Sequence, residues 1–255
     1  MRKILLFIFI FLYYSNQVFG QMYEGSPCTS KHNQVLKNQI LGGQIQRLYG
    51  DGAGHIFPSS YYLSKDWATS ILLPTSGIPK VPKVMNEDNM DLFVERDAAT
   101  CRYSPFHLRD GDTSTAWSEG VEGDGIGEFV LARIDVQTPI QIFSGYGKSK
   151  ELYFANNRPK EINIYIFEAG EYGAAQIGSV YENLQLRGKS KQTLKDTYGY
   201  QELKLPKVPL KGTAQPGVAE TEKAFYTFVA IEIVSVYKGS KYSDTLITEI
   251  KNQSN

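Results

Sequence analysis

The chain has 255 residues, of which 42% are hydrophobic and 21% are charged. These values predict a globular protein with a sizeable buried core and exclude a disordered chain. There are 27 basic and 27 acidic residues, so the composition offers no basic excess of the kind that nucleic-acid binding requires.

Residues 1 to 20 differ in character from the rest of the chain. Two basic residues precede an apolar run from Ile4 to Tyr14, and small residues end the segment at Gly20. This pattern predicts a signal peptide cleaved before Gln21, and therefore export to the periplasm, the cell surface or the medium. The run is short for a bilayer span, so we expect no membrane span after cleavage. The alternative is an uncleaved N-terminal anchor.

Cys28 and Cys101 are the only cysteines. In the oxidising compartment that export implies, they are expected to form a disulfide. A bridge closing so long a loop would stabilise the fold by about 4 kcal/mol in the chain-entropy treatment. The alternative is two unpaired thiols, because spacing alone does not establish a bond.

Residues 21 to 90 are predicted to form an irregular N-terminal extension of uncertain structure, in which residues 59 to 73 could dock as one strand or a short helix. The stretch 38 to 54 is rich in glycine and polar residues, and Pro74, Pro79 and Pro82 interrupt the chain that follows. Because proline fixes its own φ and restricts the residue before it, residues 74 to 90 are expected to be an extended connector.

A period-two pattern begins near residue 91 and continues to residue 252. Leu92 and Val94 alternate with other residues first, and further alternating segments lie at 130–136, 140–142, 162–166, 203–205, 229–233 and 246–250. Residues 170 to 198 are expected to form a long polar connection with a short strand at 177 to 181. Short alternating strands separated by turns predict an all-β, antiparallel sandwich domain over residues 91 to 252.

The stretch from Asp110 to Gly127 combines acidic residues, hydroxyl side chains and five glycines with Trp117. Such a run predicts tight turns, because glycine relaxes the backbone. A turn rich in carboxylate and hydroxyl oxygens suits Ca²⁺, which takes six to eight oxygen ligands. The alternative is an acidic surface turn without an ion.

Five phrases between residues 117 and 245, in this order, resemble a known family. They are Trp-x-Glu-Gly, Gly-x-Gly-Glu, Gly-Tyr-x-Lys-Ser, Asn-Asn-Arg-x-Lys and Val-Tyr-x-Gly-x-Lys-Tyr-x-Asp-Thr, at residues 117–120, 125–128, 145–149, 156–160 and 236–245. Together with Asp110-Gly111-Asp112, they resemble discoidin-type domains of the galactose-binding-like fold. The resemblance is strongest to the translocation or glycan-binding domain attached to NAD glycohydrolase and found on exported bacterial proteins.

The resemblance implies a jelly-roll sandwich that binds a ligand and does not catalyse a reaction. In related carbohydrate-binding modules, a structural calcium ion lies under the Asp-Gly-Asp loop and is closed by a glutamate on the last strand. On this sequence the resemblance implies a calcium site made by Asp110, Asp112, Thr115 and Glu249. The alternative is that hydrogen bonds close the loop in place of the ion.

A polar and aromatic loop at residues 144 to 159 is the candidate ligand surface. Sugars are bound by aromatic faces together with amides, carboxylates and guanidinium groups. The candidate ligand-binding residues are Tyr146, Lys148, Tyr153, Asn156, Asn157 and Arg158. The alternative is structural, with the two asparagines bonding the backbone in turns and the arginine paired with a nearby acid.

An enzymatic function is not expected. The three histidines form no metal-binding pair, and neither a Gly-x-Ser-x-Gly motif nor a phosphate-binding loop is present. Glu119, Glu122 and Asp124 could serve as paired carboxylates for glycoside hydrolysis. They are expected to lie in an exposed loop, where a carboxyl group does not acquire the raised pKa of a general acid.

The sequence therefore predicts an exported, non-catalytic binding module that recognises carbohydrate on a glycoconjugate or cell surface. Its expected partner is a glycan or glycoprotein, without nucleic acid. The alternative function is a protein-docking or translocation-type domain that binds a secreted protein without sugar.

Overall fold

The computed structural model describes residues 28, 32–50, 67–84, 86–175, 178–219 and 224–253. The predicted signal peptide and its cleavage site lie outside these ranges. The elements are α2 (Gln34–Leu41), β1 (Gln44–Gly50), η2 (Glu87–Asn89), α3 (Met90–Thr100), η3 (Pro105–Arg109), β2 (Trp117–Ser118), β3 (Phe129–Arg133), β4 (Ile140–Ser144), α4 (Lys150–Ala155), β5 (Arg158–Glu168), β6 (Glu171–Ala175), β7 (Gly178–Thr193), β8 (Gln201–Leu203), β9 (Thr227–Tyr237) and β10 (Leu246–Asn252). None of these helices is long and apolar enough to cross a bilayer.

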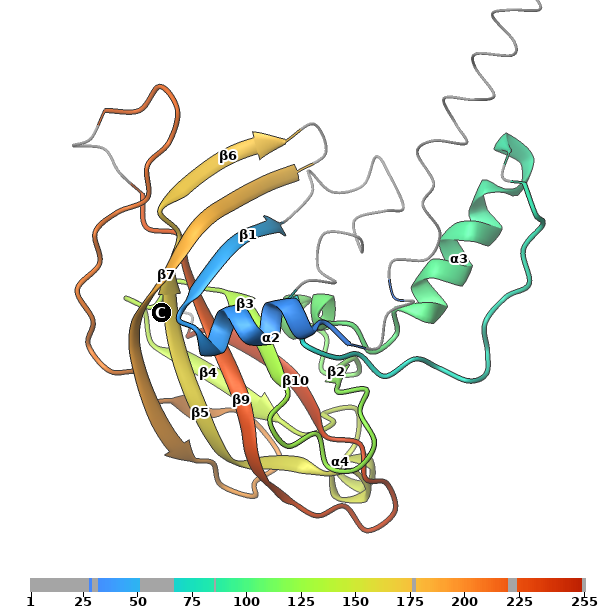
Figure 1. Cartoon of the computed structure of the whole chain (residues 1–255). Coiled ribbons are helices and arrows are strands. Elements are labelled where there is room, and N and C mark those ends of the chain that lie inside the picture. Colours follow the sequence, from blue (N-terminus) through green and yellow to red (C-terminus); the bar gives the residue numbers. More distant parts are fainter. Residues whose placement is uncertain are drawn as a thin grey trace, which may run out of the picture.

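Two antiparallel sheets form the body of the molecule, which confirms the predicted β-sandwich. The larger sheet has the strand order β1-β7-β5-β9-β3, with β6 paired to β7, and the smaller has the order β2-β10-β4-β8. In Figure 1 the larger sheet curls around the smaller one as a half-barrel. β5 and β9 share the longest central pairing, from Arg158 opposite Tyr237 to Glu168 opposite Thr227.

The larger sheet buries apolar side chains on both faces. Alternate residues such as Ile164 and Ile231 pack with Ile142 and Ile247 of the smaller sheet in the inner core. Their neighbours on the opposite face, including Phe167, belong to a second apolar cluster. Because successive side chains of a strand point to opposite faces, one run of apolar residues serves two cores.

Helix α2 and Trp67 cover the second face of the larger sheet. Leu36 and Ile40 of the helix belong to the same buried cluster as Phe129 and Phe228 of the strands. Asn33 caps the helix by accepting a hydrogen bond from the N–H of Leu36 at 3.0 Å. Helix α2 and β1 lie within residues 21 to 90, so this part of the predicted extension is integrated into the sandwich (Figure 1).

Residues 67 to 72, which we call the strap, run from β3 of the larger sheet to β2 of the smaller one: Ala68 forms a bridge with Val130, and the Leu72 N–H donates to the Ser118 carbonyl at 2.9 Å. The Ser70 carbonyl accepts a hydrogen bond from Trp117 Nε1 at 3.0 Å, and the Ser70 hydroxyl accepts one from the N–H of Gly120 at 3.1 Å. A Cβ on Gly120 would lie 2.1 Å from the carbonyl oxygen of Ile71. The Trp-x-Glu-Gly phrase therefore holds the strap against the sandwich.

Two predicted segments differ from the structure. The strand expected from Leu92 and Val94 is helix α3, whose buried residues are Phe93 and Asp97. These positions are four apart and so share one helix face, while a reciprocal pair of hydrogen bonds between Asn86 and Asn89 starts the helical segment. The expected polar connection at 170 to 198 is the hairpin of β6 and the 16-residue strand β7.

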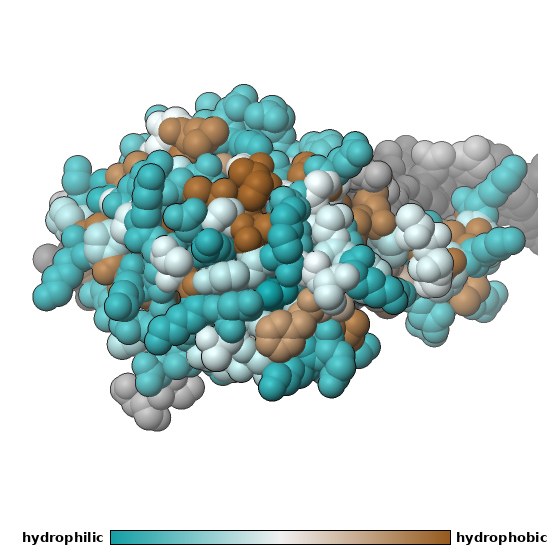
Figure 2. Space-filling model, turned by 90° about the horizontal axis from the view of Figure 1, so that it is seen from below, coloured by the Kyte–Doolittle hydropathy of each residue, from teal (hydrophilic) through white to brown (hydrophobic). Residues whose placement is uncertain are grey.

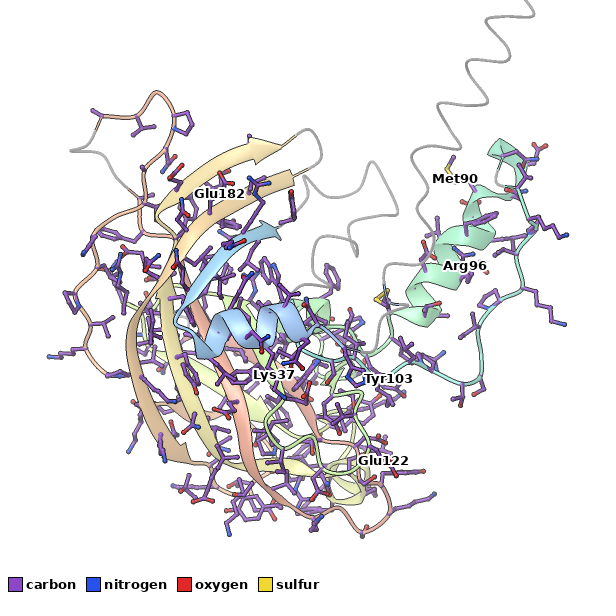
Figure 3. The ribbon with its side chains drawn as sticks, in the orientation of Figure 1. Lys37, Met90, Arg96, Tyr103, Glu122 and Glu182 are labelled. Carbon is purple, nitrogen blue, oxygen red and sulfur yellow. A yellow bond between two sulfur atoms is a disulfide. The ribbon has the colours of Figure 1, made fainter. Side chains whose placement is uncertain are left out.

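Helix α3 is tied to the N-terminal region by the Cys28–Cys101 disulfide, which confirms the predicted pairing. The two Cα atoms are 5.3 Å apart, and both cysteines are fully buried. Figure 3 shows Met90 and Arg96 on α3 to one side of the sheets, whereas Lys37 on α2 lies over the larger sheet.

Candidate functional site

The motif phrases meet at one end of the sandwich, which we call the α4 end. It comprises helix α4 and the loops at residues 119–127, 145–149, 194–200 and 238–245, and it lies at the bottom of Figure 1. Strand β5 starts here and β9 ends here, because the two strands are antiparallel neighbours. Segments that are distant in sequence are therefore brought together.

The side chain of Asn157 connects two of these loops, at residues 119–127 and 238–245. Its Nδ2 donates to Asp124 Oδ1 at 2.9 Å and to the Ser243 carbonyl at 2.7 Å. Its Oδ1 accepts a hydrogen bond from the N–H of Gly239 at 2.7 Å. With only 1% of the residue exposed, the amide acts as an internal connector of the loops.

Arg158 is buried and pairs with Asp196 from a separate loop. Its Nε and Nη2 donate to the two carboxylate oxygens at 2.9 and 2.8 Å, and Nη1 donates to the Asn156 carbonyl at 2.8 Å. The same guanidinium lies 5.1 Å from the Tyr153 ring centroid. This planar, two-point pairing is the geometry that arginine makes best with a carboxylate.

Four of the six predicted ligand-binding residues thus make side-chain hydrogen bonds within the protein. Tyr153 is fully buried and donates to the Thr197 carbonyl at 3.0 Å, while Asn156 Nδ2 donates to the Leu152 carbonyl at 2.8 Å. Together with Asn157 and Arg158, they hold the loops in place. Their binding of a ligand stays a prediction, and contact with one would require these internal bonds to rearrange.

Gly145 allows the loop after β4 to approach this buried cluster. Its φ is +88°, and a Cβ would lie 2.5 Å from Arg158 Cγ and 2.6 Å from the Tyr153 ring. Only glycine tolerates both the positive φ and the close contact. The loop then presents the half-buried Tyr146 and the exposed Lys148 at the surface.

Tyr198 is an additional surface residue that the sequence analysis missed. Its hydroxyl donates to the Gly147 carbonyl at 2.6 Å, which places it against the loop of Tyr146 and Lys148. It is 40% exposed, and Phe154 on α4 is 39% exposed. Figure 2 shows that this face is mostly polar, with separate apolar patches. The signal in the sequence is the Tyr-Gly-Tyr run at residues 198 to 200 inside a polar segment.

Glu119 is buried, which corrects the expectation that it lies in an exposed loop. Its carboxylate accepts hydrogen bonds from the N–H groups of Val121 at 2.9 Å and Thr245 at 3.2 Å. Burial, and to a lesser degree the nearby Asp244 and Glu128, raises the pKa of Glu119 to about 7. The residue is 0% exposed and its oxygens face backbone donors. Glu119 therefore holds its own loop against the segment of Thr245.

The Asp-Gly-Asp loop is closed largely by its own hydrogen bonds. Asp110 accepts from the Asp112 N–H at 2.9 Å and the Thr115 hydroxyl at 2.8 Å, and His107 Nδ1 lies 2.7 Å from its Oδ2. Burial favours a higher pKa for Asp110, but the bonds from His107, Asp112 and Thr115 outweigh it and hold the pKa below its usual value. The Asp112 carboxylate accepts from the Ser114 N–H at 2.8 Å.

Glu249 of β10 lies close enough to Asp110 for the two charges to interact, and a calcium ion between them stays a prediction. It is 2% exposed, and its Oε2 has no hydrogen-bond partner. Burial, followed by the charge of Asp110, raises the pKa of Glu249 to about 7. Within the described ranges, no three histidine, cysteine or acidic side chains gather as a metal-binding group. A cation would therefore depend on the Asp110–Glu249 pair, supplemented by the Thr115 hydroxyl and backbone oxygens.

The family comparison agrees with this arrangement of motifs. Residues 88 to 253 match the NAD glycohydrolase translocation F5/8 type C domain. The chain belongs to this family. Among curated proteins, no relative matches.

A weak structural likeness is to the cryo-EM structure of the arabinofuranosyltransferase AftD from mycobacteria, with 10% identity and a TM-score of 0.30. The likeness covers 58% of this chain and 9% of the AftD chain.

Proposed function

We propose that this protein is an exported, non-catalytic binding module that recognises carbohydrate through the surface of Tyr146, Lys148 and Tyr198. The family describes an F5/8 type C domain linked to translocation, which supports a binding or translocation module in general. The Cys28–Cys101 disulfide supports folding in an oxidising compartment.

The observation that carries the proposal is the contrast between the interior and the surface of the α4 end. Asn157 and Arg158 make polar contacts that fix the loops from within. On this rigid support, the Tyr198 ring stands beside the loop of Tyr146 and Lys148. An aromatic face beside hydrogen-bond donors is the chemistry that sugars require, and a fixed surface loses little entropy on binding.

The test uses the whole chain on a glycan array, with Tyr146→Ala and Lys148→Ala as variants and Tyr49→Ala as the control. Tyr49 lies on β1 and is 40% exposed. Each surface variant should lose about tenfold in affinity, equivalent to about 1.4 kcal/mol, while the control binds as wild type. Melting curves of all variants show whether the fold is retained.

The word translocation in the family description favours docking to a protein as the second candidate function. A blank array with correctly folded protein would contradict the carbohydrate proposal. Binding to a secreted protein that excess sugar does not compete, and that Lys148→Ala weakens, would support docking at the same surface. Glycan binding that survives both surface variants would place the sugar site elsewhere.

A further inference from the structure

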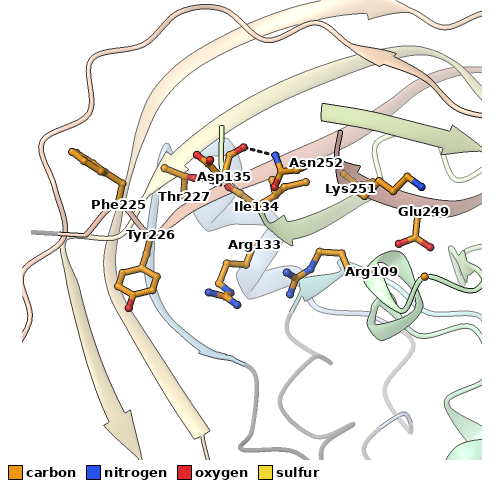
Figure 4. A pocket seen from close by; sticks show the side chains of 12 residues that line it. Arg109, Arg133, Ile134, Asp135, Phe225, Tyr226, Thr227, Glu249, Lys251 and Asn252 are labelled. Carbon is orange, nitrogen blue, oxygen red and sulfur yellow. Dashed lines mark hydrogen bonds between the residues drawn. The ribbon is translucent and has the colours of Figure 1, made fainter. Parts of the chain in front are cut away.

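Two regions outside the α4 end gather charged side chains, and they differ in how those charges are engaged. The first is a cavity of about 500 Å³, along which Figure 4 shows Arg109, Arg133 and Glu249. The two guanidinium carbons lie 5.7 and 5.8 Å from the ring centroids of Trp67 and Tyr181, respectively. The arginines of this cavity therefore interact within the molecule. The second region is the second half of β7, where lysine side chains face solvent.

The second half of β7 has a partner strand on one side only. Residues 185 to 193 pair with β5 along one edge. Along the other edge, the pairing with β1 ends at Gln185, and the Leu186 N–H then donates to the Gly43 carbonyl at 2.9 Å. From there to Thr193, the described residues supply no backbone partner to that edge. In Figure 1 this part of β7 is the lower margin of the larger sheet, to the left of β5.

Residues 204 to 208 support this part of β7 from the inner face without occupying its edge. The Gln192 side chain, opposite Ile162 of the inner core, donates to the Glu202 carbonyl at 2.9 Å and accepts from the Lys204 N–H at 2.8 Å. A Cβ on Gly188 would lie 2.4 Å from the side chain of Val208. These contacts are made by side chains, so the N–H and C=O groups of the open edge stay unpaired.

An open edge of this kind is a template to which another strand can add. Residues 187 to 193 extend over roughly 20 Å at about 3.3 Å per residue. Main-chain hydrogen bonds along such an edge supply affinity for any extended peptide, and the side chains beside the edge supply the preference for one sequence over another.

Lysine side chains surround the open edge. Residues 187 to 211 contain seven basic and two acidic residues, although the whole chain is balanced at 27 of each. Lys189 donates to the Tyr165 hydroxyl at 2.6 Å and so belongs to the sheet. Four others are exposed: Lys191, Lys195, Lys204 and Lys207. Across the part of the chain that the structure describes, none of these four ammonium groups forms an ion pair.

These charges decide which strand can add to the edge. A second copy of this chain would bring its own lysines against them, and like charges that face each other across paired strands are destabilising. A strand with acidic side chains would instead place carboxylates beside Lys191 and Lys204, while its backbone paired with the edge. An anionic polysaccharide would match the charges, but it lacks the regular alternation of N–H and C=O groups.

We propose that the open edge of β7 binds an extended acidic segment of a protein partner, which adds to the larger sheet as a further strand. This surface shares no residue with the proposed glycan surface of Tyr146, Lys148 and Tyr198. The module can therefore hold a protein and a glycan at the same time.

The test measures binding of the fluorescein-labelled peptide Thr-Glu-Val-Glu-Val-Glu-Thr to the whole chain by fluorescence anisotropy. The comparison probes are the fully N-methylated form of this peptide, which keeps the carboxylates and lacks the backbone donors, the peptide Thr-Lys-Val-Lys-Val-Lys-Thr, and dextran sulfate. We expect the acidic peptide to bind at least about tenfold more tightly than its N-methylated form, and the lysine peptide not to bind.

Two charge reversals on the protein locate the site. Lys191→Glu and Lys204→Glu should each weaken binding of the acidic peptide about tenfold. Lys80→Glu, the same change at an exposed residue of the connector, is the matched control and should bind as wild type. Hydrogen exchange of the complex should show slower exchange of amides within residues 187 to 193, because strand addition pairs them.

Equal binding of the acidic peptide and its N-methylated form would overturn the proposal, because charge alone would then suffice. Preference for dextran sulfate, without slower exchange at residues 187 to 193, would overturn it in favour of an anionic polysaccharide. The proposal also fails if the folded protein binds no acidic peptide, or if binding persists in both lysine variants with native melting curves. Tyr146→Ala should bind the peptide as wild type, so failure of this edge and failure of the α4-end surface can be told apart.

Discussion

Arg158 and Asp196 form a two-point ion pair across the α4 end, with Nε–Oδ1 and Nη2–Oδ2 distances of 2.9 and 2.8 Å. The arginine side chain is 4% exposed and the aspartate side chain 31%. The pair joins the start of β5 to the loop that leads to β8, so it ties the larger sheet to a connection of the smaller one.

Arg158→Ala should therefore act on stability. It removes both bonds to Asp196 and leaves the carbonyl of Asn156 without its donor. Loss of one partner from a largely buried pair predicts a decrease of about 3 kcal/mol in the free energy of unfolding. Urea denaturation measures it, and Arg47→Ala is the control, because the Arg47–Glu182 pair is exposed and should contribute much less to stability. Equal effects of the two variants would contradict this role.

Gly125 and Gly123 allow a close-contact effect to be separated from backbone strain. Both have positive φ, of +68° and +101°, so alanine is strained at either position, at about 1 kcal/mol. At Gly125 the new Cβ would also lie 2.4 Å from Glu119 Cγ, whereas at Gly123 nothing lies within 4 Å. Gly125→Ala should therefore destabilise the protein by a further ~2 kcal/mol in urea denaturation. If Gly125→Ala and Gly123→Ala have the same free energy of unfolding, the Glu119 side chain can move aside for the new Cβ.

Glu119 predicts a pH dependence of stability. Its pKa is raised from 4.5 to about 7 in the folded protein, so between these values the folded state binds more protons than the unfolded state. The contribution of this group should be most favourable below pH 4.5, fall as the pH rises to about 7, and level off above that. Glu119→Gln should reduce the slope of this part of the melting-temperature profile, with the remainder due to Glu249, whose pKa is also raised to about 7, and the exposed Glu122→Gln should leave the slope unchanged. If the melting temperature of Glu119→Gln changes with pH as steeply as that of the wild type, other groups cause the pH dependence.

Calcium should raise the melting temperature if the Asp110–Glu249 pair holds the ion. A cation between them would relieve their repulsion and give Glu249 Oε2 a partner. Calcium at a hundredfold excess over its Kd would stabilise the fold by about 2.7 kcal/mol. Scanning calorimetry in calcium and in EDTA measures the difference, which Glu249→Gln should remove and the exposed Asp88→Asn should retain. Identical wild-type curves in both buffers would rule out a structural calcium ion.

The alternation of Ile162, Ile164 and Ile166, and of Val229 and Ile231, is sufficient to predict the central strands. Alternation does not identify helix α3, because Leu92 and Val94 form too short an alternating pair to establish a period, and the deciding contacts of Asn86 and Asn89 are local hydrogen bonds. Strand β7 lies where the sequence indicates a polar connection, since its buried residues Tyr181 and Leu184 are followed by a mostly polar run to Thr193.

The candidate site is predictable from the sequence as a group of residues but not as a geometry. Polar and aromatic side chains do gather in the segment from 144 to 159, as its composition indicates. Whether Asn157 and Arg158 face solvent depends on Asp196, Gly239 and Ser243, which lie far along the chain. Those partners become neighbours only when the sheets form, so the sequence alone leaves both alternatives open.

The matched family region begins at residue 88, yet the strap and helix α2 precede it. A recombinant fragment cut at that boundary would lose Leu36, Ile40 and Trp67 from the cluster that covers Phe129 and Phe228. One whole side of the larger sheet would then meet water as a continuous apolar surface, which favours self-association. The unit of homology is therefore smaller than the unit of folding, and expression of this domain should begin well upstream of the family boundary.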